Sequence, residues 1–139
     1  MKAEERKDYV KKAFRDYVNN KRCLEKLNIP GLYGMDYSRS CVVSDHMNGT
    51  ENSVLNYIDR KETLEKQIEI VKRTIEYYKI EDKKRGGDGK ANYIYNRWLR
   101  RLSFRGAAIQ SHIAESTSAY WTEEIFFTAE IIAEEYQLF

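Results

Sequence analysis

The stretch Leu-Ser-Phe-Arg-Gly-Ala-Ala-Ile-Gln-Ser-His-Ile-Ala-Glu-Ser-Thr-Ser-Ala-Tyr-Trp, residues 102–121, decides the fold that we expect for the C-terminal part of this chain. Its pattern predicts a helix, a tight turn at residues 112–114, and a second helix that begins at Glu115 or Ser116, where a side-chain oxygen can accept from free backbone N–H groups. The small residue Ala108 stands where the two helices should cross. This layout is typical of a helix-turn-helix, which presents its second helix to the major groove of DNA.

Other positions in the same stretch agree less well with that motif. Ser118 and Trp121, three residues apart, should both face the first helix. However, Ser111 and Ser118 replace the aliphatic side chains that are usual there, and His112 stands where the turn often has a glycine with positive φ. Histidine tolerates that conformation better than a β-branched residue does. A plain helical hairpin is therefore the alternative interpretation.

The composition suits a soluble, helix-rich protein of one domain or two small helical units. Charged residues make up 33% of the 139 residues, and proline occurs once, so long stretches are free of helix breakers. No apolar run approaches the roughly 20 residues needed to cross a bilayer, and the N-terminus lacks the apolar core of a secretory signal. We expect a cytoplasmic protein whose two cysteines, Cys23 and Cys41, are free thiols.

The net charge of +2 is small, but the charges are unevenly distributed along the chain. Residues 90–105 contain no acidic side chain, and their basic residues are Lys90, Arg97, Arg100, Arg101 and Arg105. After residue 105 there is no Lys or Arg, and the charged residues are Glu115, Glu123, Glu124, Glu130, Glu134 and Glu135. Contacts with DNA phosphates should therefore come from the basic block, and the acidic end should face away from DNA or toward a protein.

The N-terminal part, residues 1–82, is predicted to form a coiled-coil-like hairpin of two helices. Apolar residues recur every three or four positions in residues 3–27, and Pro30 ends that helix. Residues 31–50 follow as an irregular connection. The longest helix, residues 51–81, carries a heptad-like seam of Tyr57, Lys61, Leu64, Ile68, Val71, Ile75 and Tyr78. This stripe needs a partner, and the first helix, antiparallel to it, is the nearest candidate.

A glycine-rich linker at residues 83–91 should join the hairpin to a helix-turn-helix domain, residues 92–139. The first helix of that domain, residues 92–102, has Trp98 as its expected core anchor. The last helix should run nearly to Leu138, with an apolar stripe of Ile125, Phe126, Ala129, Ile132, Ala133 and Tyr136 that Phe127 and Ile131 widen. So much apolar surface predicts packing against the hairpin or against a second chain.

No converging set of titratable side chains indicates catalysis, and we expect neither an enzyme nor a cofactor. His46 and His112 lie at no metal-ligand spacing from a cysteine or from each other, so no metal site is predicted. Most carboxylates fall near a Lys or Arg on solvated helix faces. Tyr93, Tyr95 and Tyr120 flank the basic block and could bind or stack on nucleic acid, although packing with an exposed hydroxyl is the commoner arrangement.

The order of these elements resembles that of the small phage-encoded transcription activators of the RinA and ArpU type, whose C-terminal part is similar to region four of sigma factors. The matching order is a short N-terminal helix, a connection containing Tyr, Ser and Val (residues 37–44), a long helix that includes residues 52–58, and a helix-turn-helix that ends in a long helix. Residues 103–108 and 112–121 look like the DNA-reading part. The resemblance covers most of the chain.

The resemblance implies a phage or prophage regulator, cytoplasmic in a bacterial host cell, that binds double-stranded DNA, activates late or packaging genes, and contacts RNA polymerase or a sigma factor. Carried over by position, the residues that would face the groove or its edges are Glu115, Ser116, Thr117, Ser118, Ala119 and Tyr120. The residues that would meet phosphates are Arg100, Arg101 and Arg105, with Arg97 from the same basic block.

The presumed recognition helix has no Arg, Lys, Asn or Gln before Gln137, although direct readout of bases relies on those side chains. Base contact would then rest on Ser, Thr, Tyr and Glu, with modest affinity or with the help of a homodimer. Two alternatives stay open. One is a protein-interaction adaptor that uses a degenerate helix-turn-helix, and the other is a DNA-packaging component similar to a small terminase subunit.

Overall fold

The computed structural model describes residues 2–27, 50–84 and 89–139, with only the backbone described for residues 50–56. All regular structure in these ranges is helical: α1 (Ala3–Arg15), α2 (Tyr17–Leu27), α3 (Thr50–Lys84), α4 (Lys90–Ile94), the π-helical turn η2 (Tyr95–Leu99), α5 (Phe104–Gln110) and α6 (Glu115–Glu135). The predicted all-α class is therefore confirmed. The predicted irregular connection, residues 31–50, lies outside the described residues except for Thr50, which begins α3.

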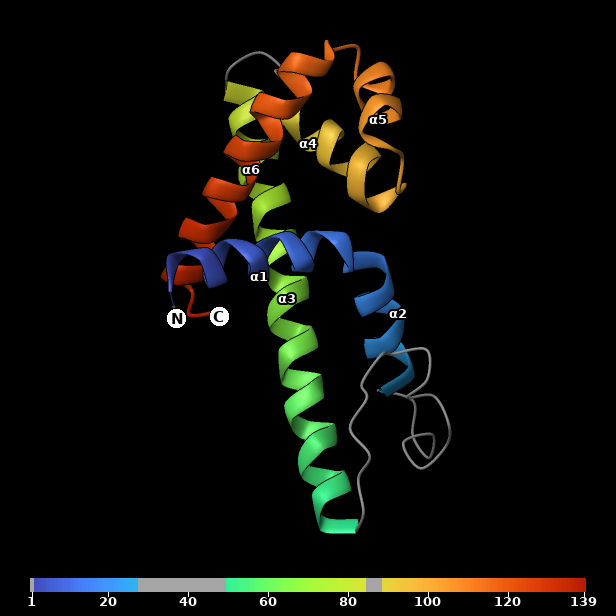
Figure 1. The fold of residues 1–139 in the computed structure, drawn as a ribbon, viewed down its shortest axis with the longest axis vertical. Coiled ribbons are helices and arrows are strands. Elements are labelled where there is room, and N and C mark those ends of the chain that lie inside the picture. Colours follow the sequence, from blue (N-terminus) through green and yellow to red (C-terminus); the bar gives the residue numbers. More distant parts are fainter. Residues whose placement is uncertain (1, 28–49, 85–88) are drawn as a thin grey trace.

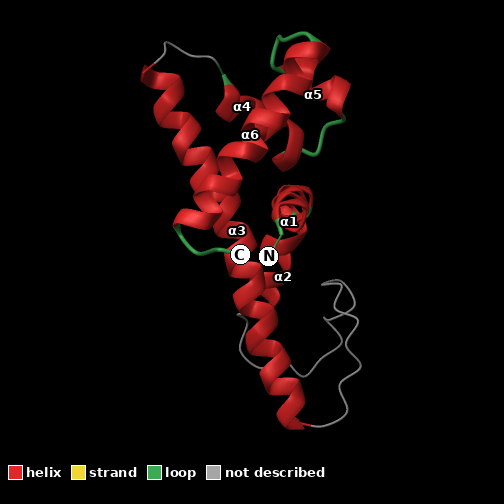
Figure 2. Ribbon diagram, turned by 60° about the vertical axis from the view of Figure 1, so that its left-hand side comes forward, coloured by secondary structure: helices red, strands yellow, loops and turns green. Residues whose placement is uncertain are grey.

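The long helix α3 is the axis of the molecule (Figure 1). Helix α2 runs antiparallel beside its first part and α6 beside its second part, while α1 crosses between them. Figure 2, in which α1 is seen nearly end-on, shows the same arrangement. The two chain ends lie close together, because Tyr9 of α1 packs against the ring of Phe139 at 5.7 Å.

The single helix predicted over residues 3–27 is wrong in one respect, because it breaks at Asp16. Asp16 has φ −98° and ψ 9°, so the chain turns there and continues as α2. The helix before the break packs on α3 and α6, whereas the helix after it packs on α3 and η2. Because the two segments pack against different sets of helices, the chain bends between them. The three- and four-residue spacing of apolar residues continues through this region and does not reveal the bend.

The predicted antiparallel hairpin is present, formed by α2 with α3. The Asn20 side-chain amide donates to Gln67 Oε1 at 2.9 Å between these helices, and both residues are buried. Farther along, the Tyr57 hydroxyl donates to the carbonyl of Leu27 at 2.6 Å. Because the partners run in opposite chain directions, these two bonds set the register of the pair.

Four of the seven predicted seam residues of α3 are buried, and burial also extends beyond the seam. Among the seam residues, Leu64, Ile68, Val71 and Tyr78 are buried. Gln67, Ile70 and Thr74 are buried as well, because α1 and α6 cover a second face of the helix. A two-helix coiled coil would leave those three positions at its edge.

The two predicted units, residues 1–82 and 92–139, share one hydrophobic core. The ring of Phe14 in α1 lies 5.0 Å from that of Trp98 and 5.6 Å from that of Phe126, between ring centroids. Trp98 is thus the core anchor that the sequence predicted, but its partners come from both units. The predicted domain boundary therefore falls between two helices, but residues on both sides of it pack into the same hydrophobic core.

The predicted linker, residues 83–91, overlaps two helices at its ends, and its residues 85–88 lie outside the described residues. Lys83 and Lys84 belong to α3, while Lys90 and Ala91 already belong to α4. Gly89 has φ +85°, a conformation that favours glycine, and directly precedes α4.

The helix predicted over residues 92–102 ends early, in a wider turn. The Arg100 N–H bonds the carbonyl of Tyr95, five residues back, at 2.8 Å, which is the spacing of a π-helix. The Leu102 N–H then bonds the carbonyl of Asn96 at 3.2 Å. This wider turn lets both Asn96 and Trp98 face the interior, where they are buried.

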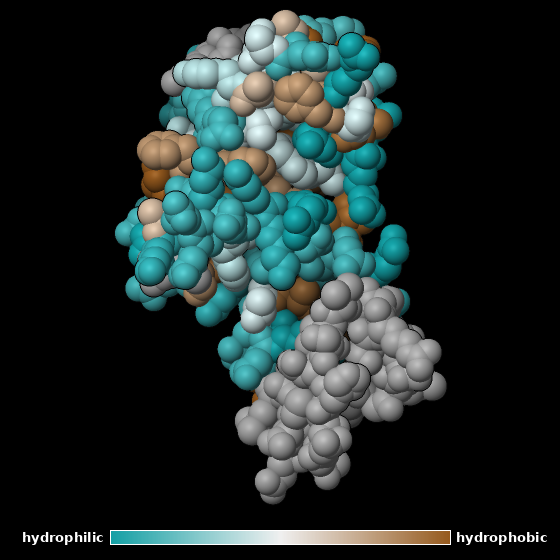
Figure 3. All heavy atoms as spheres, viewed as in Figure 1, coloured by the Kyte–Doolittle hydropathy of each residue, from teal (hydrophilic) through white to brown (hydrophobic). Residues whose placement is uncertain are grey.

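The apolar stripe of α6 is narrower than predicted. Ile125, Phe126, Ala129, Ile132 and Ala133 are buried, but the side chains of Phe127 and Ile131 are 64% and 50% exposed. A small hydrophobic area shows over α6 at the upper left of the otherwise mostly hydrophilic surface in Figure 3. Among the described residues, no helix has an apolar stretch long enough to span a bilayer.

If the two halves share one core, a cavity in the N-terminal half must destabilise the C-terminal half. We expect Ile70→Ala, at a fully buried position of α3, to lower the free energy of unfolding by about 2–5 kcal/mol. Both tryptophans, Trp98 and Trp121, lie in the C-terminal half, so their fluorescence should follow urea unfolding at the same lowered midpoint as the far-ultraviolet circular dichroism.

The matched control is Ile80→Ala on the same helix. Ile80 is 56% exposed, and its loss should change the free energy of unfolding by less than about 0.5 kcal/mol. A tryptophan transition that Ile70→Ala leaves in place would mean that the two halves unfold independently.

Candidate nucleic-acid interface

The turn between α5 and α6 has the conformation that the helix-turn-helix prediction requires. His112 has φ +58°, in the left-handed region, and its N–H bonds the carbonyl of Ile109 at 3.1 Å. The Ile113 N–H bonds the carbonyl of Ala108 at 3.0 Å, and the Ile113 side chain packs against the core. The turn therefore closes tightly with a histidine where glycine is common.

Helices α5 and α6 are in contact, and small residues lie on their buried sides. Ala107 and Ala108 on α5 and Ser118 on α6 are buried, with almost no exposed surface. At the start of α5, the Ser103 hydroxyl accepts from the Gly106 N–H at 3.0 Å and caps the helix. The burial of Ala108 agrees with its predicted place inside the fold.

The start of α6 differs from the predicted cap. The helix begins at Glu115, which is one of the two predicted starts. However, the residue in the capping position is Ala114, which has no side-chain oxygen. Glu115 lies in the first turn, where its negative charge is favourable beside the helix N-terminus. No side chain caps this helix.

Ser118 was predicted both to face α5 and to read DNA, but the side-chain partner that the structure gives it is Tyr93 of α4. Ser118 is fully buried, and its Oγ lies 2.6 Å from the Tyr93 hydroxyl, which also lies 3.0 Å from Thr122 Oγ1. A side chain held in this way between α4 and α6 cannot reach a DNA groove. Tyr93 likewise belongs to the core.

The outward face of the first turns of α6 carries the other predicted groove residues. Tyr120 is 70% exposed, and Glu115, Ser116 and Ala119 are exposed, whereas Thr117 is half-buried. Ser116 and Tyr120 are four residues apart and share one side of the helix. The exposed groups are a hydroxyl and a phenol, which can bond base edges or phosphates.

The four predicted phosphate contacts differ in their freedom to meet DNA. Arg100 and Arg101 are exposed at the chain segment before α5, and Arg101 has φ +58°. Arg97 is partly buried, and its guanidinium donates to the Leu102 carbonyl at 3.2 Å, so it holds the backbone of that segment. Arg105 pairs with Glu115 across the motif at 2.8 Å. Arg100 and Arg101 are therefore the better candidates.

Asn96 connects the arginines to the helix-turn-helix and was not singled out in the sequence. Its side-chain amide donates to Ser111 Oγ, at the end of α5, at 3.1 Å. Its carbonyl Oδ1 accepts from the Arg100 guanidinium at 3.2 Å. One buried amide thus fixes both the turn and the arginine segment. Its only sequence signal was a polar residue inside an apolar helical pattern.

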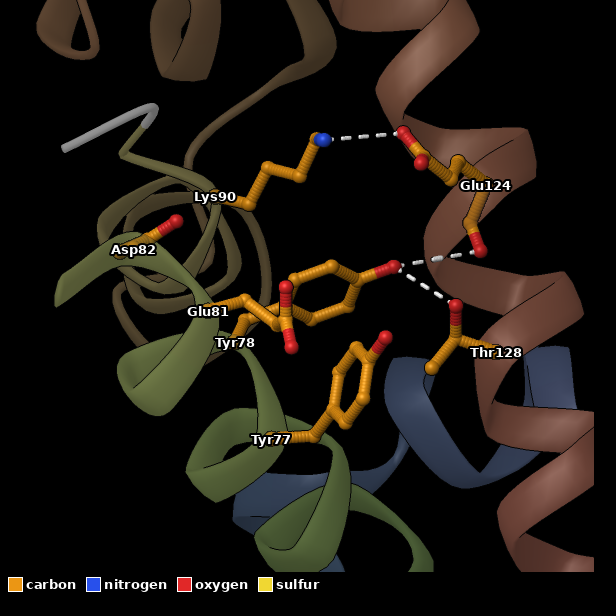
Figure 4. A pocket seen from close by; sticks show the side chains of 7 residues that line it. All are labelled: Tyr77, Tyr78, Glu81, Asp82, Lys90, Glu124 and Thr128. Atoms are coloured by element: carbon orange, nitrogen blue, oxygen red, sulfur yellow. Dashed lines mark hydrogen bonds and ion pairs between the residues drawn. The ribbon is translucent and has the colours of Figure 1, made fainter. Parts of the chain in front are cut away.

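A polar cluster fixes α6 against α3 and α4 (Figure 4). Lys90 pairs with Glu124 at 3.1 Å, and the Tyr78 hydroxyl lies 2.8 Å from Thr128 Oγ1. Burial raises the pKa of Tyr78 to about 12, so its phenol stays protonated. The pocket between these side chains holds about 40 Å³, room for water but not for a larger ligand. The cluster therefore orients α6.

Nothing in the described part of the chain groups three or more His, Cys, Asp or Glu side chains closely enough to hold a metal ion. Cys23 is buried, whereas Cys41 and His46 lie outside the described residues. The arrangement around α5 and α6 offers exposed hydrogen-bonding and cationic groups, which is the chemistry of a binding surface.

Comparison with protein-family models, with curated proteins and with solved structures finds no match to this chain.

The buried role of Ser118 can be tested against Ser116 on the same helix. We expect Ser118→Ala to lower the free energy of unfolding by about 1 kcal/mol relative to Ser116→Ala, because the Tyr93 hydroxyl loses a buried partner. Both changes place alanine in α6, so the effect of helix propensity largely cancels. Urea unfolding measures the difference, and equal stability of the two variants would contradict the assigned role.

Proposed function

We propose that this chain is a sequence-specific DNA-binding regulator of transcription that places the first turns of α6 in the major groove. The observation that carries the proposal is the tight turn at His112 between α5 and α6, which are in contact, with Ser116 and Tyr120 left exposed at the start of α6. A helix-turn-helix presents the start of its second helix to the major groove.

The phosphate contacts in this proposal come from the segment before α5. In helix-turn-helix proteins, the helix before the recognition helix crosses the DNA backbone. Arg100 and Arg101 are exposed beside the N-terminus of α5, and Asn96 holds Arg100 in place. Arg105 is exposed as well, but it must exchange Glu115 for a phosphate oxygen.

Base contacts in this proposal rest on Tyr120 and Ser116, with a smaller part for the half-buried Thr117. Single hydroxyl groups discriminate bases less well than the bidentate side chains of Arg, Asn or Gln. A homodimer on two half-sites would compensate, because the second contact becomes intramolecular. The resemblance to RinA- and ArpU-type activators favours late or packaging genes of a phage and a host RNA polymerase or sigma factor as the protein partner.

A second candidate function is a protein-interaction adaptor that does not bind DNA. The observation that favours it is α6 itself, which carries no Lys or Arg and exposes Phe127 and Ile131 on its surface. A measurement of affinity for duplex DNA distinguishes the two functions, because an adaptor of this kind does not bind DNA.

The double change Arg100→Ala with Arg101→Ala should weaken binding to every duplex sequence to a similar degree. Each lost phosphate contact should make the slope of log affinity against log salt shallower by about 0.9. A mobility-shift titration at several salt concentrations measures both effects. The control is Lys72→Ala with Lys79→Ala, which removes the same charge from exposed positions of α3. If the arginine variant keeps the affinity and slope of the parent, the phosphate assignment is wrong.

The change Tyr120→Ala should alter the preferred DNA sequence while the fold keeps its stability, because the side chain is 70% exposed. Selection of bound duplexes from a random pool shows the preference. Phe127→Ala is the matched control, since Phe127 is a similarly exposed ring on α6, about 10 Å farther along the helix. A preference that changes with Phe127 and not with Tyr120 would place the reading surface elsewhere.

A further inference from the structure

A cleft of about 290 Å³ opens between α2 and the end of η2. Its lining residues are Tyr17, Val18, Lys21, Arg22, Glu25 and Leu99. Lys21, Arg22 and Glu25 are exposed, whereas Tyr17 is buried and Val18 and Leu99 are half-buried. The cleft therefore has an apolar floor and a charged rim.

The rim carries two cations and one acid, so its charge is net positive. Glu25 lies four residues after Lys21 and three after Arg22 on α2, and no ion pair joins it to either among the described residues. The Lys21 ammonium lies 5.6 Å from the centroid of the Tyr17 ring, which holds it at the edge of the cleft.

The cleft adjoins the proposed phosphate contacts of the C-terminal half. Leu99, on the floor of the cleft, directly precedes Arg100 and Arg101 in the chain. Consecutive Cα atoms are about 3.8 Å apart, so the backbone of both arginines lies near the cleft. Helix α2 contributes its cations from the N-terminal half, and it is in contact with η2, the element that leads to Arg100. The sequence alone does not reveal this contact, because the two segments are almost 80 positions apart.

We propose that this cleft is a second binding site for the sugar–phosphate backbone of the duplex held by α6, with Lys21 and Arg22 as its phosphate ligands. Ammonium and guanidinium groups donate charge-assisted bonds to phosphate oxygens, and the apolar floor suits the less polar face of a deoxyribose. The site rests on the proposed DNA-binding function. With this site, the N-terminal hairpin also binds the duplex. Its contacts with the DNA backbone help to set the orientation of the protein along the duplex.

The test uses the full chain and a fluorescein-labelled duplex of mixed sequence, about 30 base pairs long, because phosphate contacts are independent of sequence. Fluorescence anisotropy gives affinity between about 50 and 200 mM salt. Lys21→Ala with Arg22→Ala should weaken binding about tenfold and make the salt slope shallower by about 2. The control, Lys72→Ala with Lys79→Ala, makes the same change in net charge outside the cleft.

A variant that is expected to bind DNA more tightly complements the test, because misfolding cannot increase affinity. Glu25→Gln removes the acid from the rim and should tighten binding about threefold. Glu76→Gln, at an exposed position of α3, removes the same charge outside the cleft and should leave affinity nearly unchanged.

The outcomes separate this proposal from the proposed function. If Arg100→Ala with Arg101→Ala weakens binding but neither cleft variant changes it, the cleft is not a backbone site and the helix-turn-helix function stands. If the lysine controls on α3 weaken binding as much as the cleft variant does, the effect is one of net charge and the cleft proposal fails. If the parent protein binds no duplex at all, both proposals fail.

Discussion

Three aromatic rings hold the two halves of this chain together. Phe14 from α1 packs against both Trp98 and Phe126, and the rings of Trp98 and Phe126 lie 5.5 Å apart. Large rings in tilted and edge-on contact bury much apolar surface and favour defined orientations. Because one ring of the three comes from α1, the position of α6, and therefore of the surface proposed to meet DNA, depends on a helix more than a hundred residues earlier.

Polar contacts add orientation to that packing. A buried hydroxyl or ammonium group without a partner is costly, so each one admits few positions of the neighbouring helix. Ser118 with Tyr93, Glu124 with Lys90, and Thr128 with Tyr78 tie three successive turns of α6 to α4 or α3. These ties are consistent with a helix held at one rotation about its axis, which decides which side chains of its first turns reach solvent.

The charges are distributed unevenly over the helices. Cations of α2 line the cleft, two exposed arginines follow Leu99 of its floor in the chain, and α6 carries only acidic charges. Some of those acids form ion pairs at the surface, since Glu123 pairs with Lys7 and Glu134 with Arg6 on α1. Such an arrangement orients a protein that approaches a polyanion before any specific contact forms.

The sequence by itself determined the features that depend on neighbouring residues: the helical class, the apolar faces, the tight turn with His112 at positive φ, and Trp98 as a core residue. Only the tertiary structure decided the break at Asp16, the π-helical turn, the burial of Ser118 and the exposure of Phe127. Periodicity shows that a face is apolar, but the partner that covers it is set by packing among distant helices. The cleft between α2 and η2 belongs to the second group, because only the folded chain brings its two sides together.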